Sequence, residues 1–233
     1  MQFGTNIAPG IKRLAIAVAV IATVVVLYKL KYPTYSYRYR LTVNLDVDGQ
    51  LRAGSSVIEA YVRKNPPLLL GNRLAFSIHA NAVLVQIPDN KLVVALLASG
   101  PLGQDVDFLT RLVPSHFKLE LFKDQQLAQL PMVRGNWDLS PAEFPTMILF
   151  EQPRDPRSAR HLKAGETIQM SGRLVRIRGV TVEITNDPVT VGIESKLGWW
   201  KDPGRPTVVA VQAAGLWTAS STDAESAFSR NGY

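Results

Sequence analysis

Hydrophobic and polar positions alternate strictly from residue 35 to residue 47, and this is the clearest structural signal in the chain. Aromatic and aliphatic side chains occupy the odd positions, whereas polar and charged side chains occupy the even ones. This period of two predicts a β-strand with one buried face. The next two residues, Asp48 and Gly49, readily adopt the positive φ values of a tight hairpin turn. We therefore expect a returning strand within residues 51–63.

A second hairpin is predicted farther along the chain. Residues 82–87 and 91–98 are rich in β-forming side chains, and the segment Pro88-Asp89-Asn90 between them is typical of a turn. The return arm is apolar on both faces, which predicts a strand near the middle of the fold. A further short buried strand is expected at residues 147–150.

The alternation changes phase between residues 174 and 185. Apolar residues fall on odd positions up to Ile177 and on even positions from Val180 onward. A strand keeps one buried face through such a switch only if it contains one extra residue. Gly179 lies at the break, so we expect a β-bulge there, in which the glycine would take a positive φ.

The helical signal in the remainder of the domain is limited. Residues 105–113 carry an apolar stripe at helical spacing, and Pro114 is expected to end that helix. Residues 118–130 mix both periods, and no element is predicted for them. Together these patterns predict a mainly β fold, with antiparallel hairpins in a sandwich- or barrel-like arrangement and a short helical insertion, behind one N-terminal transmembrane helix.

That N-terminal segment is long and apolar enough for a membrane helix. Residues 14–28 contain no charge, and residues 11–30 would span about 30 Å as a helix, which matches a bilayer core. A buried core helix would rarely be apolar all round and flanked by bases at both ends. A cleaved signal peptide is the stronger alternative, but small-x-small sites lie inside the apolar run and none follows it. We expect a single, retained transmembrane helix.

The predicted organisation has five parts. These are a basic tail (1–13), the transmembrane helix (11–30), a basic and aromatic juxtamembrane segment (31–40), one β-rich domain (41–200) and a weakly ordered C-terminal tail (201–233). The bases and tyrosines that flank the helix are candidate contacts with lipid headgroups. They are Lys12, Arg13, Tyr28, Lys29, Lys31, Tyr32, Arg38 and Arg40. Three more tyrosines, Tyr35, Tyr37 and Tyr39, would extend this aromatic belt.

The net charge of +7 is concentrated around the predicted helix. Residues 1–40 hold six basic and no acidic residues, whereas residues 41–233 hold 20 basic and 19 acidic residues. This location fits membrane lipid as a partner and argues against nucleic acid. A short tail without acidic residues resists export across a bacterial inner membrane, which favours a periplasmic domain, whereas a simple count of bases slightly favours a cytoplasmic one.

Motifs for catalysis or metal binding are not apparent. Cysteine is absent, which excludes disulfides, thiolate metal sites and cysteine nucleophiles. The three histidines, His79, His116 and His161, show no metal-ligand spacing, and we predict no metal and no cofactor. The segment Gly54-Ser55-Ser56 could expose a nucleophilic serine, although a bulge or bend is the favoured interpretation.

Two other features are candidate contact sites. Arg173, Arg176 and Arg178 form the densest basic cluster of the domain, either as a charged face paired with acidic residues or as an anion-binding site. Trp199 and Trp200 could cap the core, or one of them could reach a partner.

Two stretches resemble segments of an uncharacterised family of bacterial membrane-anchored proteins. The first is residues 37–62, YRYRLTVNLDVDGQLRAGSSVIEAYV, and the second lies within residues 144–200. The matching positions of the second stretch are Asp155-Pro156, the run TNDPVT at residues 185–190, Gly192-Ile193-Glu194 and Leu197. Glu151 and Gly198 depart from the family pattern, which has aspartate and proline there. The resemblance implies a membrane-anchored domain of this layout and no particular reaction or ligand.

Anchoring and the lack of catalytic motifs favour an accessory, binding or assembly protein of the bacterial envelope, with a membrane or envelope protein as its partner. The alternative is a membrane-tethered hydrolase in which His79 or His116 acts with a nearby serine. A histidine close to a serine hydroxyl would support the hydrolase. A filled core with exposed apolar surface would support the binding protein.

Overall fold

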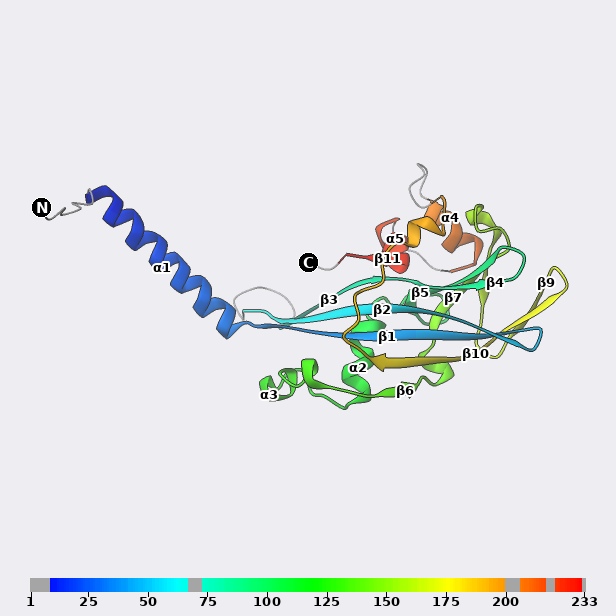
Figure 1. Ribbon diagram of the computed structural model, residues 1–233, viewed down its shortest axis with the longest axis horizontal. Helices are drawn as coiled ribbons and strands as arrows, with labels where there is room; N and C mark the ends of the chain where they lie inside the picture. The colour runs from blue at the N-terminus through cyan, green and yellow to red at the C-terminus, as the bar shows by residue number, and fades with distance from the viewer. Residues whose placement is uncertain (1–8, 67–72, 200–205, 217–220, 232–233) are drawn as a thin grey trace, which may run out of the picture. The chain divides into compact units, whose positions relative to one another are not determined.

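The computed structural model describes residues 9–66, 73–199, 206–216 and 221–231 (Figure 1). The chain divides into two compact units. One unit comprises residues 1–34 and 62–75, and the other comprises residues 35–61 and 76–233. Helix α1 (Pro9–Lys31) belongs to the first unit, and most of the β-structure belongs to the second.

Two sheets account for the strands of the described residues. The larger sheet has the order β11-β3-β2-β1-β10-β6, and β9 also pairs with β10. Its strands are β1 (Thr34–Val47), β2 (Gln50–Lys64), β3 (Leu74–Asn81), β6 (Asn136–Asp138), β9 (Thr167–Met170), β10 (Arg173–Ile184) and β11 (Ser229–Arg230). The smaller sheet has the order β4-β5-β7-β8, with β4 (Val83–Ile87), β5 (Lys91–Ser99), β7 (Pro145–Phe150) and β8 (Ala159–Leu162). The predicted mainly antiparallel β fold is confirmed, and neither sheet closes into a barrel.

Both hairpins predicted from the sequence are present. Asp48 and Gly49 join β1 to β2 with φ values of 53° and 80°. Asp89 and Asn90 join β4 to β5 with φ values of 62° and 56°. As expected, β5 is buried on both faces along its whole length, and it pairs with β4 on one side and β7 on the other.

The C-terminal helices cover one face of the smaller sheet. Helices α4 (Pro206–Ala213) and α5 (Ser221–Phe228) contact each other, and they contact β8 and β5 respectively (Figure 1). Phe228 is fully buried in a cluster with Leu96 and Phe150. In residues 206–216 and 221–231, the structure therefore differs from the weakly ordered tail expected for residues 201–233. The apolar surface that orders these short helices comes from β5 and β7, so the tail's own composition did not reveal it.

Helix α2 (Phe108–His116) begins later than predicted and continues through Pro114, so the prediction that this proline ends the helix is wrong. A proline cannot donate a hydrogen bond to the carbonyl four residues earlier, which here belongs to Thr110. The Tyr37 hydroxyl donates to that carbonyl at 3.1 Å instead. The Tyr39 hydroxyl likewise donates to the Leu109 carbonyl at 2.9 Å.

These two tyrosines fix α2 to the larger sheet. Tyr37 and Tyr39 are 5% and 0% exposed, so neither belongs to an aromatic belt at a lipid interface. Burial raises the pKa of both hydroxyls well above the usual value, which keeps them protonated as donors. The remaining helical elements are short: α3 (Asp124–Leu127), η1 (Leu130–Met132), η2 (Pro141–Glu143), η3 (Pro156–Ser158) and η4 (Ile193–Ser195).

The predicted bulge in β10 is confirmed by its pairing with β1. Asn44 lies opposite Gly179 and Leu45 lies opposite Ile177, so Arg178 is the extra residue. The expected positive φ at Gly179 is wrong, and a Cβ added to this glycine would meet nothing within 4 Å. The bulge therefore needs the extra residue and does not need a glycine.

Gly54 is the glycine whose missing side chain matters. It lies within β2, where an added Cβ would be 2.1 Å from the carbonyl oxygen of Leu84 and 3.1 Å from Cγ2 of Val85 in β4. The backbones of the two sheets approach each other closely at this point. Ser56, two residues later, is 1% exposed and donates to the Asn81 carbonyl at 2.6 Å. The Gly54-Ser55-Ser56 segment is thus part of a strand and not a loop, with Gly54 half-buried, Ser55 exposed and Ser56 buried.

This contrast between two glycines is testable. We expect Gly54→Ala to lower the free energy of unfolding by about 1–3 kcal/mol, because the new methyl group collides with backbone. Gly179→Ala should change it by no more than about 0.5–1 kcal/mol, because the added group meets open space. Denaturant unfolding of the full chain in detergent, followed by tryptophan fluorescence, measures both. Equal losses in the two variants would contradict the close approach at Gly54.

Candidate functional sites

A gap in the outer edge of β10 opens a cavity. β9 pairs with residues 173–176 and β6 pairs with residues 181–183 on that edge, and among the described residues no strand covers the part between them. The bulge lies in this gap. A cavity of about 450 Å³ opens beside Ile177, which is a size common for small-molecule sites.

The wall of this edge cavity is mostly apolar. It is formed by residues 100–102 after β5, residues 141–142 and 144–147 at η2 and β7, residues 161–164 at the end of β8, and Ile177. The Thr146 hydroxyl is already engaged, because it donates to the Gly100 carbonyl at 3.0 Å. His161 and Lys163 line the β8 side. The cavity is therefore able to hold an apolar group, with two nitrogen-bearing side chains among its lining residues.

The charge state of His161 is set by its surroundings. Partial burial lowers the pKa of its imidazole, repulsion by the Lys163 ammonium lowers it further, and the Glu166 carboxylate opposes these effects. The imidazole is thus neutral at neutral pH, and it carries one donor and one acceptor nitrogen.

The arginine cluster on β10 is largely paired. The Arg173 guanidinium contacts the carboxylates of Asp89 and Asp48 at 2.7 and 3.1 Å, and these contacts raise its pKa. Arg176 contacts Asp46 at 2.7 Å, and its hydrogen bond lowers the pKa of that carboxyl. Arg178, the bulged residue, is exposed. The geometry of the first two arginines matches the expected charged face paired with acidic residues.

Trp199 is buried within the C-terminal cluster. It is 3% exposed, its indole nitrogen donates to the Pro153 carbonyl at 2.8 Å, and its ring lies 5.9 Å from that of Phe150 and 6.0 Å from that of Phe228. This side chain caps the core and cannot meet a partner in this conformation. Trp200, the other candidate, lies outside the described residues.

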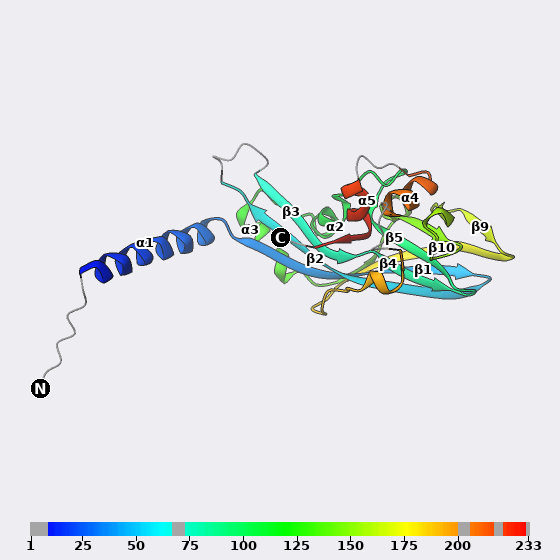
Figure 2. The same ribbon diagram turned by 90° about the horizontal axis from the view of Figure 1, so that it is seen from above.

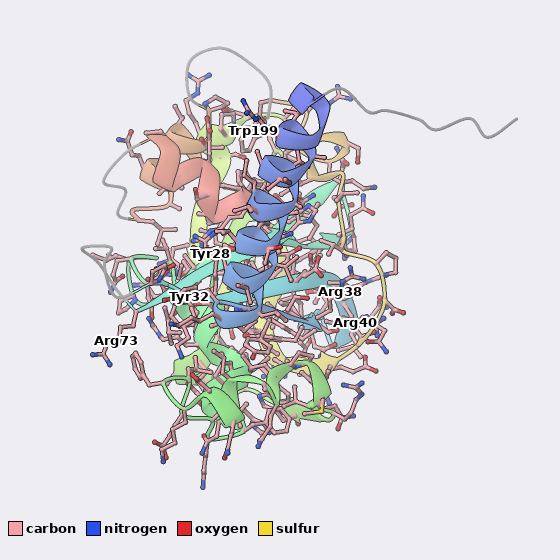
Figure 3. The ribbon with its side chains drawn as sticks, turned by 90° about the vertical axis from the view of Figure 1, so that its left-hand side faces the viewer. Tyr28, Tyr32, Arg38, Arg40, Arg73 and Trp199 are labelled. Carbon is pink, nitrogen blue, oxygen red and sulfur yellow. The ribbon has the colours of Figure 1, made fainter. Side chains whose placement is uncertain are left out.

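The candidate lipid-contact residues fall into two groups. The first group lies in or directly after α1: Lys12, Arg13, Tyr28, Lys29, Lys31 and Tyr32. Arg38 and Arg40 form the second group and lie on β1 (Figure 3). Arg38 contacts Glu59 at 3.2 Å, and Arg40 contacts Glu183 at 2.6 Å and also pairs with Asp187. These two arginines therefore neutralise acids of the domain.

Asp187 belongs to a strap, residues 185–192, that crosses a face of the larger sheet (Figures 1 and 2). The strap begins beside β1, where the Thr185 N–H donates to the Arg38 carbonyl at 3.1 Å. It reaches β2, where the Thr190 N–H donates to the Val57 carbonyl and the Val57 N–H donates to the Thr190 hydroxyl. The TNDPVT run thus has a structural role in this chain.

Asn81 fastens the end of the strap. It is 6% exposed and lies at the end of β3. With its amide oxygen oriented toward the strap, it accepts hydrogen bonds from the N–H groups of Gly192 and Ile193 at 2.9 and 3.1 Å. Its amide nitrogen then donates to the Ser229 hydroxyl of β11 at 2.8 Å. One buried side chain thereby joins β3, the strap and the C-terminal strand.

The three histidines lie on three different elements, β3, α2 and β8. In the described part of the chain, no histidine is hydrogen-bonded to a serine. His116 stacks on Trp137 with their ring centroids 3.9 Å apart, and His79 is half-buried in β3. Within the same residues, no group of three or more His, Asp and Glu side chains is placed to hold a metal ion.

The segment from Lys118 to Arg134, which we call the helical excursion, exposes two large apolar side chains. It contains α3 and η1, and Phe122 and Met132 are 76% and 65% exposed. Leu127 and Leu130 are 1% and 0% exposed and hold the excursion on the domain. The sequence did not indicate this site, because residues 118–130 fit neither a strand nor a helix pattern.

Comparisons with family models, curated proteins and solved structures give no match to this chain.

The charge state of His161 gives a prediction. Its folded-state pKa lies below the ordinary value of 6.5, so the folded state binds fewer protons than the unfolded state. The stability that His161 contributes should be complete above about pH 6.5 and should fall as the pH drops below it. NMR titration of the imidazole Cε1–H signal in the full chain measures the pKa, and His161→Gln identifies the signal. A midpoint at or above 6.5 would contradict the prediction.

Proposed function

We propose that this chain is a single-pass protein of the bacterial inner membrane whose β-rich domain is an accessory, binding or assembly module of the envelope. The observation that carries the proposal is an apolar helix that no other described residue buries. The large hydrophobic side chains from Leu14 to Leu30 of α1 keep 46–73% of their surface exposed. Removing apolar surface from water is favourable by about 25 cal/mol per Å². Lipid is the environment that supplies this stabilisation.

The dimensions and polar groups of α1 fit a bilayer. The stretch Arg13–Lys31 has 19 residues with a mean hydropathy of 2.2, and it spans about 28 Å as a helix. Thr23 satisfies its hydroxyl within the helix by donating to the Ala19 carbonyl at 2.8 Å. The charges lie at the ends, where Arg13 and Lys29 can reach lipid headgroups.

We place the domain on the periplasmic side. The segment before the helix carries Lys12 and Arg13 and no acidic residue, and such a tail resists export against the membrane potential. A long domain, in contrast, is exported largely regardless of its charge.

Binding is favoured over hydrolysis by the polar groups of the domain. Of the two serines considered as nucleophiles, Ser56 is buried and hydrogen-bonded to backbone, and Ser55 is exposed on β2, where no histidine among the described residues is hydrogen-bonded to it. The edge cavity is apolar, and the excursion exposes Phe122 and Met132. Apolar concave and exposed surfaces of this kind are typical of binding sites.

The absence of cysteine allows a direct test of anchor and orientation. We expect full-length protein to remain in membranes after carbonate washing. A membrane-impermeant maleimide should label Arg52→Cys, an exposed position in β2, in intact spheroplasts. The same reagent should label Gln2→Cys only after lysis.

Each part of the proposal can fail separately. Release by carbonate, or a mature N-terminus between residues 20 and 45, would refute the anchor. Labelling of Gln2→Cys and not Arg52→Cys in intact spheroplasts would place the domain in the cytoplasm while leaving the anchor intact. The unmodified, cysteine-free chain is the blank for both measurements.

A further inference from the structure

We infer that the helical excursion is a second membrane contact, at which Phe122 and Met132 enter the lipid interface and hold the domain against the bilayer. This inference rests on the proposed membrane anchor. Its starting observation is the pair of exposed apolar side chains, 76% and 65% exposed, within one short excursion of the domain. Apolar and aromatic side chains presented in this way are typical of segments that lie in a membrane interface.

The helical excursion is held in place by buried leucines and by polar contacts of its own. Leu127 and Leu130 point into the domain and are almost completely buried. The Gln126 side chain accepts a hydrogen bond from the Glu120 N–H, and the Lys123 ammonium contacts the Glu120 carboxylate at 2.8 Å. The exposure of Phe122 therefore comes from a segment with its own internal contacts and two buried leucines.

The excursion lies beside the residues at which the chain enters the domain. Pro131 and Arg134, which flank Met132, line a hollow together with residues 36–38 of β1. Ser36 is five residues after Lys31, the last residue of α1. An extended chain of five residues spans at most about 18 Å, so Ser36 stays within that distance of the helix end whatever direction the helix takes. A bilayer around α1 is consequently within reach of Met132.

The contact is mainly apolar. The excursion contains three basic and two acidic residues, so its net charge is small. Attraction to anionic headgroups is therefore weak, and apolar insertion provides the main driving force. A membrane of zwitterionic lipid should suffice, and the contact should persist at raised salt concentration.

Leu51 is a matched control within the same unit. It is 59% exposed, which is close to the exposure of Met132, and it lies just past the turn at the far end of β1. The eleven residue steps from Ser36 to Val47 span about 36 Å along the strand. An exposed leucine there should remain in water if proximity to the anchor decides membrane contact.

The test uses the cysteine-free full chain, reconstituted in phosphatidylcholine vesicles with or without a doxyl-labelled phosphatidylcholine. Single cysteines at Phe122, Met132, Leu51 and Val20 are labelled with the environment-sensitive fluorophore NBD. We expect the doxyl lipid to quench the probes at residues 20, 122 and 132, and to leave the probe at residue 51 unchanged. Quenching at 122 and 132 should be the same at raised salt.

The apolar probe could itself drive insertion, so a second measurement places it on a polar position. Gln129→Cys is exposed and lies between the two apolar residues. Its quenching should be lost in the double variant Phe122→Ser/Met132→Ser and retained in Leu51→Ser. Retained quenching in the double variant would overturn the role of the two side chains.

The remaining outcomes are distinguishable. Quenching at Val20 without quenching at residues 122 and 132 would overturn this inference and leave the anchor standing. A blue-shifted but unquenched probe at residue 122 would also overturn it, because the side chain would then be covered by protein. Absence of quenching at Val20 would remove the anchor, and with it the basis of the inference.

Discussion

A single extra residue in β10 is the constraint on which the rest of the domain depends. Because side chains alternate along a strand, a shift of one residue would turn every apolar side chain of one half of β10 away from the core. The insertion of Arg178 allows Val175 on one side and Val180 on the other to be completely buried in the same pairing with β1. The same irregularity lies where neither β6 nor β9 covers the outer edge of β10, and the edge cavity opens there. The β-bulge thus keeps apolar side chains buried on both sides of Arg178, and it lies where the edge cavity opens.

Many charged side chains of the domain form ion pairs with other residues of the domain. Arg40 and Asp187 fasten the strap, Arg38 holds Glu59, and Arg173 bridges Asp48 and Asp89 across two hairpin turns. Partly exposed ion pairs of this kind stabilise a fold only slightly, by about 0–1 kcal/mol each. Their effect is to determine where the chain crosses the sheet. The bases that looked like one positive patch next to the apolar helix therefore divide into those of α1 and those of β1, and the two on β1, Arg38 and Arg40, are paired within the fold.

The sequence pattern predicted those features that depend only on residues close together in the chain. The alternation in β1, the two hairpin turns, the doubly buried β5 and the phase change at Gly179 can all be seen within a few residues, and all are present. The features that the sequence did not predict depend on contacts between residues that are far apart in the sequence. Helix α2 runs through Pro114 because a tyrosine more than 70 residues away satisfies the freed carbonyl. The edge cavity is assembled from separate segments around β5, η2, β7, β8 and β10. The exposure of Phe122 could not be inferred, because its neighbours fit no single period.

The proposed membrane anchor would restrict how the domain is oriented. Lipid can cover α1 only if the polar groups of the helix are satisfied internally, and Thr23 meets this condition. The chain that leaves the helix enters β1 directly, and Tyr37 and Tyr39 hold α2 on the sheet at that end. The excursion follows α2 and lies beside residues 36–38 of β1, so its apolar side chains are fixed close to where the chain enters this sheet. A domain held at two points has a restricted orientation, and the edge cavity and the distal hairpins would then face a defined direction. Such an orientation would suit the proposed role of presenting a surface to partners in the envelope, and a single flexible tether would not provide it.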